Sequence, residues 1–181
     1  MKGMVFVHLL EMVENEFGEL LLESAIEHAQ TSTQGVFTSA GTYPAEDMLK
    51  LVASLSELTQ LPPSALYQHY GRYLFSKLFA SYPMFPQEVL NNAFSFLASI
   101  NDVIHVEVHK LYPDAELPKF ITHYHDENKM ILEYTSSRRM SDLALGLIEG
   151  CLQHFKEDVE IQMVPLLEDG TSVQFTLIRK P

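Results

Sequence analysis

Three polar side chains in the last third of the chain alternate along the sequence: Tyr134, Ser136 and Arg138. In a β-strand this spacing would place all three on one face. Arg138 could then bind one carboxylate through two parallel hydrogen bonds, while the hydroxyl groups donate to a second carboxylate. The spacing therefore predicts a site for a ligand with two carboxylates, although a solvated strand end would show the same pattern.

A histidine stands in an apolar stretch of a predicted helix. His105 is surrounded in sequence by Val103, Ile104, Val106 and Val108. An apolar environment keeps an imidazole neutral, as iron ligation requires. Histidine is a common haem ligand, and haem also carries two propionates that would suit the carboxylate site. The alternative is a core histidine that is hydrogen-bonded to the backbone.

Two pairs of histidines could instead bind a metal ion without haem. His105 and His109 are four residues apart on one helix face, which could hold zinc. Glu107 between them does not stand where the zinc-protease pattern requires it. His123 and His125 form a second pair on a predicted strand. A non-haem metal protein that uses these four histidines, and a module whose Phe- and Tyr-rich interior binds an apolar ligand, therefore remain alternatives.

The composition limits the class of protein. With 181 residues the chain fits a single domain covering residues 1–181. A formal net charge of -12 argues against nucleic acid and anionic membranes as partners, and suggests a basic docking partner. Cys151 is the single cysteine, which excludes a disulfide within the chain and fits a reducing cytoplasm. No apolar run approaches the roughly 20 residues of a membrane span.

The elements that must position these side chains follow from hydrophobic spacing and turn residues. Helices are expected at 5–21 with a break at Gly18, and at 45–58, 64–81, 86–111 and 143–156. Strands are expected at 119–124, 129–135, 159–167 and 172–179. The sequence therefore predicts an α+β fold, in which a helical part (about 1–118) packs on a four-stranded antiparallel sheet (about 119–181) with one inserted helix.

These motifs together resemble one known family. The Tyr-x-Ser-x-Arg motif at 134–138, the segment from Ile104 to Phe120 and the opening Met1-Lys2-Gly3 are similar to H-NOX domains, which bind haem and include the sensor domain of soluble guanylate cyclase. The resemblance implies haem b between the two parts of the fold. It implies that His105 is the iron ligand and that Tyr134, Ser136 and Arg138 hold the propionates. It also implies that Pro118 presses on the porphyrin.

The resemblance extends to the gas-binding pocket. Oxygen-binding members place a tyrosine nine residues after the clamp tyrosine, where this chain has Leu143. Their other pocket positions fall on Leu9 and near Leu74, and Val5 and Met140 are also expected to contact the cofactor. A buried polar group without a hydrogen bond loses on the order of 1–3 kcal/mol. Bound oxygen would be such a group, because Leu143 offers it no donor. The resemblance therefore implies binding of nitric oxide and carbon monoxide without stable oxygen binding.

The resemblance also implies how the domain would transmit a signal to another protein. Nitric oxide would weaken the bond to His105 until it breaks, and the helical and sheet parts would then shift. The expected output is a separate signalling protein, such as a histidine kinase or a cyclic-di-GMP enzyme, because no output module follows the second strand pair. Since the sequence shows no nucleophile–base pair, phosphate-binding glycine loop or carboxylate dyad, we do not expect an enzyme.

Overall fold

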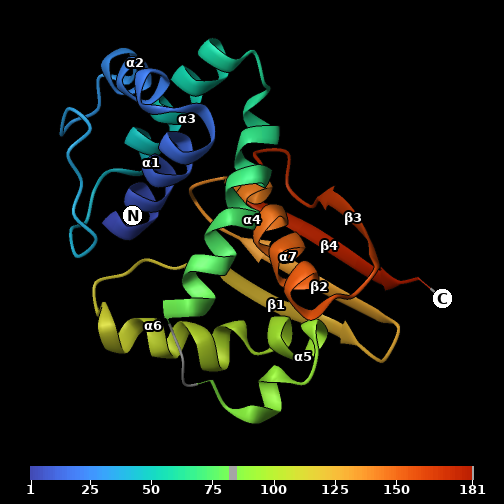
Figure 1. Ribbon diagram of the computed structural model, residues 1–181. Coiled ribbons are helices and arrows are strands. Elements are labelled where there is room, and N and C mark those ends of the chain that lie inside the picture. The colour runs from blue at the N-terminus through green and yellow to red at the C-terminus, as the bar shows by residue number, and fades with distance from the viewer. Residues whose placement is uncertain (82–84, 181) are drawn as a thin grey trace.

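The computed structural model describes residues 1–81 and 85–180. The helical part begins with α1 (Gly3–Phe17), α2 (Glu19–Ala29), α3 (Ala45–Thr59) and α4 (Pro63–Ser81), followed by η1 (Gln87–Leu90), α5 (Ala93–Ala98), η2 (Ile100–Ile104) and α6 (His105–Leu111). The sheet part contains β1 (Lys119–His125), β2 (Lys129–Thr135), α7 (Ser141–Phe155), β3 (Val159–Pro165) and β4 (Ser172–Arg179). Figure 1 shows α4 and α7 side by side at the centre of the molecule. None of the helices in 1–81 and 85–180 has the length and apolar character that crossing a bilayer requires.

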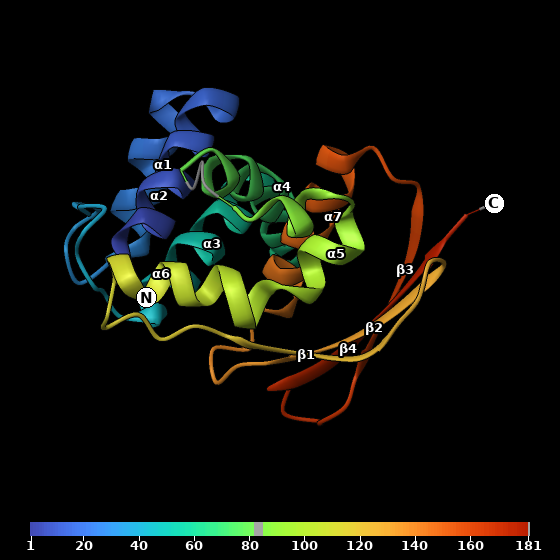
Figure 2. The ribbon, with the colours of Figure 1, turned by 90° about the horizontal axis from the view of Figure 1, so that it is seen from below.

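The four strands form one antiparallel sheet in the order β1-β2-β4-β3. The helices lie on one side of this curved sheet (Figure 2). Alternate side chains on that face are buried, as the period of two requires: Phe120, Met130, Leu132, Tyr134, Val173, Phe175 and Leu177. A second core joins α1 to α4, so the predicted α+β fold and the break at Gly18 are confirmed.

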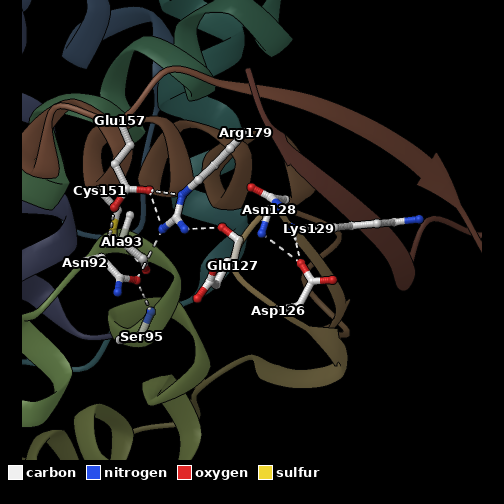
Figure 3. A network of polar contacts seen from close by, with 10 residues as sticks. All are labelled: Asn92, Ala93, Ser95, Asp126, Glu127, Asn128, Lys129, Cys151, Glu157 and Arg179. Atoms are coloured by element: carbon white, nitrogen blue, oxygen red, sulfur yellow. Dashed lines mark hydrogen bonds and ion pairs between the residues drawn. The ribbon is translucent and has the colours of Figure 1, made fainter. Parts of the chain in front are cut away.

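The prediction of a single helix over 86–111 is wrong, because a local cap and a long-range contact start a shorter helix there. Asn92 caps α5 by accepting a hydrogen bond from the Ser95 N–H at 2.9 Å, and Glu157 accepts one from the Ala93 N–H at 2.8 Å. Figure 3 shows how Arg179 at the end of β4 holds this Glu157, with 2.8 Å between Nε and Oε2. The start of α5 is thereby fixed to the segment after α7 and, through Arg179, to β4.

The strand alternation considered for Tyr134, Ser136 and Arg138 does not extend through this motif, although the predicted strand bounds 129–135 are those of β2. β2 stops at Thr135, and Ser136 and Arg138 lie in the tight turn that follows. In this turn the Arg138 N–H donates to Ser136 Oγ at 3.2 Å, and the Ser136 N–H donates to the Thr171 carbonyl at 2.9 Å. Strand alternation is therefore not the reason why the three motif side chains lie together.

Two glycines allow the backbones of α4 and α7 to approach closely. A Cβ on Gly146 would lie 2.2 Å from the Gln68 carbonyl oxygen, and one on Gly71 would lie 2.6 Å from the Leu143 carbonyl oxygen. Because both obstacles are backbone atoms, neither can move aside without shifting a helix.

Gly146→Ala is expected to lower the free energy of unfolding by about 1–3 kcal/mol, because the added methyl forces α4 and α7 apart. Denaturant unfolding of the haem-free protein measures the change. Gln153→Ala, at an exposed position of the same helix, serves as the control and should stay within about 0.5 kcal/mol of wild type. Equal effects of the two changes would show that the helices do not depend on this contact.

Candidate functional site

A cavity of about 250 Å³ lies where the helical part meets the sheet. Its walls come from the start of α1, the second half of α4, the first half of α7, η2 and α6, the loop before β1 and the end of β2. The cavity therefore collects side chains that are more than 140 residues apart in sequence, from Val5 to Ile148.

His105 is the first residue of α6 and lines this cavity. Its imidazole lies beside the ring of Phe120, with 6.2 Å between ring centroids. Burial, together with the neighbouring His109, lowers the pKa of His105 to about 4. The imidazole is thus neutral at physiological pH and has a nitrogen lone pair available for a metal.

We expect the free energy of unfolding of the haem-free protein to fall as the pH drops from about 6.5 to about 4. The unfolded chain takes up a proton on this histidine near pH 6.5, whereas folded His105 stays neutral until about pH 4, so protons favour the unfolded state in between. The loss attributable to His105 is at most roughly 3 kcal/mol.

Denaturant unfolding of wild type and His105→Leu across this pH range measures the effect. Carboxylates titrate in both proteins, so the difference between the two curves isolates His105. Parallel curves would contradict the lowered pKa.

The three motif residues all reach the cavity, although they stand at the end of β2 and in the turn after it. Arg138 is largely covered, and its guanidinium donates to the Glu116 backbone carbonyl at 2.7 Å and to the Glu116 carboxylate at 3.1 Å. Tyr134 is buried, which raises the pKa of its phenol, so the hydroxyl remains protonated and able to donate. The wall thus has a carboxylate-binding cation beside two hydroxyl groups.

The helical walls of the cavity have a different character. The residues that α1, α4 and α7 contribute to it carry no side-chain N–H or O–H: Met4, Val5, Leu74, Phe75, Leu78, Phe79, Leu143, Ala144, Leu147 and Ile148. A polar ligand bound against these walls would find no hydrogen-bond donor among their side chains.

Most side chains that the sequence assigned to the pocket lie at this cavity, namely Val5, Leu74, Pro118, Met140 and Leu143. Leu9 does not line it. That side chain is buried in the core between α1 and the other N-terminal helices. It shares a face of α1 with Val5 but lies one turn farther along the helix, beyond the cavity.

Several other residues of the cavity were not predicted from the sequence. Leu147 follows Leu143 by one turn of α7, so helical spacing could have identified it. Glu116 gave no signal, because its contact with Arg138 depends on a loop conformation that no local pattern encodes.

The histidines proposed for a non-haem metal do not gather. His123 pairs with Glu133 at 2.7 Å, and the His125 ring packs against Phe94 with 5.9 Å between centroids. Within residues 1–81 and 85–180 no three His, Cys, Asp or Glu side chains form a group that could hold a metal ion. Among the described residues that line the cavity, His105 is the one histidine that could bind a metal there.

Known proteins define the class to which this fold and cavity belong. Residues 2–163 match the family described as Haem-NO-binding (HNOB). The chain is similar to the unliganded Fe(II) H-NOX protein from K. algicida, with 37% identity and a TM-score of 0.92 over 100% of this chain and 97% of that one. The H-NOX protein from S. oneidensis in the Fe(II)NO state gives 26% identity and a TM-score of 0.88, with 100% of both chains covered.

A third structure is the IWP-051-bound H-NOX from Shewanella woodyi in the Fe(II)CO state, with 39% identity and a TM-score of 0.81 over 100% of this chain and 95% of that chain. The chain therefore belongs to the Haem-NO-binding (H-NOX) family. Domains of this family bind haem and serve as gas sensors.

The cavity residues fit a haem group. A neutral imidazole suits the iron, apolar walls suit the porphyrin ring, and a guanidinium that already binds a carboxylate suits a propionate. Glu116 in this arrangement shows what chemistry Arg138 accepts, because its carboxylate has the same charge and shape as a propionate.

Proposed function

We propose that this chain is a sensor of nitric oxide and carbon monoxide that binds haem b in the described cavity and does not retain oxygen. When bound, the haem supplies a ferrous iron with one open position for a gas. The observation that carries the proposal is the donor-free character of the walls formed by α1, α4 and α7. The S. oneidensis and S. woodyi relatives, which carry nitric oxide and carbon monoxide respectively, support the choice of gases.

In this proposal the groups of residues around the cavity have different roles. His105 provides the protein ligand to iron from α6. Tyr134, Ser136 and Arg138 orient the porphyrin by its propionates, and Pro118 presses against the ring from the loop before β1. The apolar side chains of Leu74 and Leu143 exclude water and offer a gas no hydrogen bond.

The lack of a donor discriminates between gases. Bound oxygen carries partial negative charge and gains on the order of 1–3 kcal/mol from a buried donor. Nitric oxide and carbon monoxide acquire much less charge and do not depend on such a donor. An absorption spectrum of the ferrous haem-loaded protein in air tests this, since a long-lived oxygen-bound spectrum would refute the proposal.

Glu116→Gln is expected to slow the transfer of haem to an acceptor protein by up to about fivefold, because Glu116 competes with a propionate for Arg138. The effect is small because the Glu116 carboxylate is mostly exposed to solvent. Glu107→Gln, which alters a carboxylate paired with Lys110 instead, is the matched control. Unchanged or faster transfer in Glu116→Gln would show that the two carboxylates do not compete.

We also propose that the whole chain works as one domain and that its signal passes to a separate histidine kinase or cyclic-di-GMP enzyme. The K. algicida and S. oneidensis chains, covered to 97% and 100%, support a domain of this size. The net charge of -12 favours a partner with a basic surface. Co-purification with a candidate kinase, and loss of the effect on its activity when the sensor lacks haem, would test this step.

A further inference from the structure

The backbone changes its helical type directly before His105. Residues Ile100–Ile104 form a π-helical turn, in which the Ser99 carbonyl accepts hydrogen bonds from the N–H groups of Val103 at 2.9 Å and Ile104 at 3.3 Å. The His105 N–H closes the turn on the Ile100 carbonyl. Such turns are rare and occur frequently at functional sites. Because each residue of an α-helix turns by about 100°, a register change here alters the direction in which His105 points.

One side chain ties this turn to the sheet. The Asn101 amide donates from Nδ2 to the Phe120 carbonyl and accepts from the Phe120 N–H at 3.2 Å. Asn101 thus satisfies both backbone groups of Phe120, much as a neighbouring strand would do. These two hydrogen bonds, called the Asn101–Phe120 tie below, are partly shielded from water because Asn101 is half-buried and Phe120 is buried.

The residue held in this way is also a neighbour of the site. The Phe120 ring lies 6.2 Å from the His105 ring and 5.4 Å from the Tyr134 ring, measured between centroids. Phe120 also pairs with Tyr134 in the register of β1 and β2. The Asn101 amide therefore connects the turn before the proposed iron ligand to the strand that ends in the proposed propionate clamp.

We propose that Asn101 is a positioning residue, which holds the π-helical turn against β1 and thereby directs the His105 imidazole into the cavity. The importance of this direction for gas sensing rests on the proposed function, whereas the direction itself is a property of the haem-free fold. Without the tie the turn can relax to ordinary α-helical register, and His105 would then leave the wall beside Phe120.

The test compares Asn101→Ala, Asn101→Asp and the control Asn91→Ala, all as haem-free protein. Asn91 is exposed and lies in the segment just before α5, so its replacement leaves the tie intact. Two signals are measured by NMR: hydrogen exchange of the Phe120 amide, and the nuclear Overhauser effect between the His105 and Phe120 rings. The same samples are then loaded with haem, and the iron–histidine stretching band is recorded by resonance Raman spectroscopy.

In Asn101→Ala we expect Phe120 amide exchange to be at least about tenfold faster, loss of the ring-to-ring signal, and a shifted or broadened iron–histidine band. Asn101→Asp keeps the acceptor but not the donor, so its Phe120 amide should stay protected while the ring-to-ring signal weakens. Asn91→Ala should match wild type in every signal.

A retained ring-to-ring signal in Asn101→Ala would overturn the inference, as would faster Phe120 exchange with an unchanged iron–histidine band. If Asn101→Ala does not fold, Asn101→Asp decides: a weakened ring-to-ring signal supports the inference, and an unchanged signal overturns it. A wild type that binds no haem would refute the proposed function, while the ring-to-ring signals of the haem-free samples would still support or overturn the role of Asn101.

Discussion

Replacing Leu143 with tyrosine is expected to let the ferrous haem-loaded protein retain oxygen. Leu143 lies on the first turn of α7 and lines the cavity, so a tyrosine there would add a hydroxyl to walls that have no donor. A hydrogen bond worth roughly 1–3 kcal/mol strengthens oxygen binding by about fivefold to more than a hundredfold. Absorption spectra taken across a series of oxygen pressures give the affinity of each protein.

Leu143→Phe is the matched control, because it adds an aromatic ring of similar size without the hydroxyl. Oxygen retention by the tyrosine variant alone would assign the effect to the donor. Equal retention by both variants would assign it to pocket shape, and retention by wild type would remove the basis of the proposed gas preference. Neither replacement should abolish carbon monoxide binding, which serves as the measure of an intact pocket.

Removal of the His105 side chain is expected to have the largest effect on the cofactor. His105→Gly takes away the one imidazole at the cavity, and we expect haem to dissociate on the order of a hundredfold faster or more, since loss of a supporting partner alone costs up to about that much in metal sites. Added imidazole should restore a histidine-like spectrum, because it can occupy the space that the variant leaves.

His109→Gly controls for the cost of glycine in α6, which is at most about 1 kcal/mol in a helix interior. His109 is exposed and is not among the residues that line the cavity, so its loss should leave haem retention and spectrum unchanged. An unaltered spectrum in His105→Gly would show that another group binds the iron. Haem loss in both variants would instead point to a general failure of α6.

The outline of the fold could be predicted because its signals are local. Gly18 marks the boundary of α1 and α2 through its positive φ of 88°, and alternating apolar residues mark the strands of the sheet. The segment 86–111 shows where local signals end. No proline or glycine interrupts it after Pro86. Asn92 caps α5 locally, but the hydrogen bonds of Glu157 with Ala93 and of Asn101 with Phe120 join residues that are far apart in sequence.

In the candidate site, too, local signals could be read from the sequence, whereas contacts between distant residues could not. His105 could be singled out by its apolar neighbours in the sequence, and Arg138 by the chemistry of its motif. Leu9 could not be judged from spacing, because helical position alone does not tell a cavity wall from a core between helices. The Glu116–Arg138 contact and the Asn101–Phe120 tie required the three-dimensional arrangement of loops.

The most direct test of the central proposal is the absorption spectrum of the purified ferrous protein before and after nitric oxide. We predict a Soret band that shifts when the gas is added, and its new position would report whether His105 remains bound to the iron. A protein that shows no Soret band even after reconstitution with haem would contradict the proposed function.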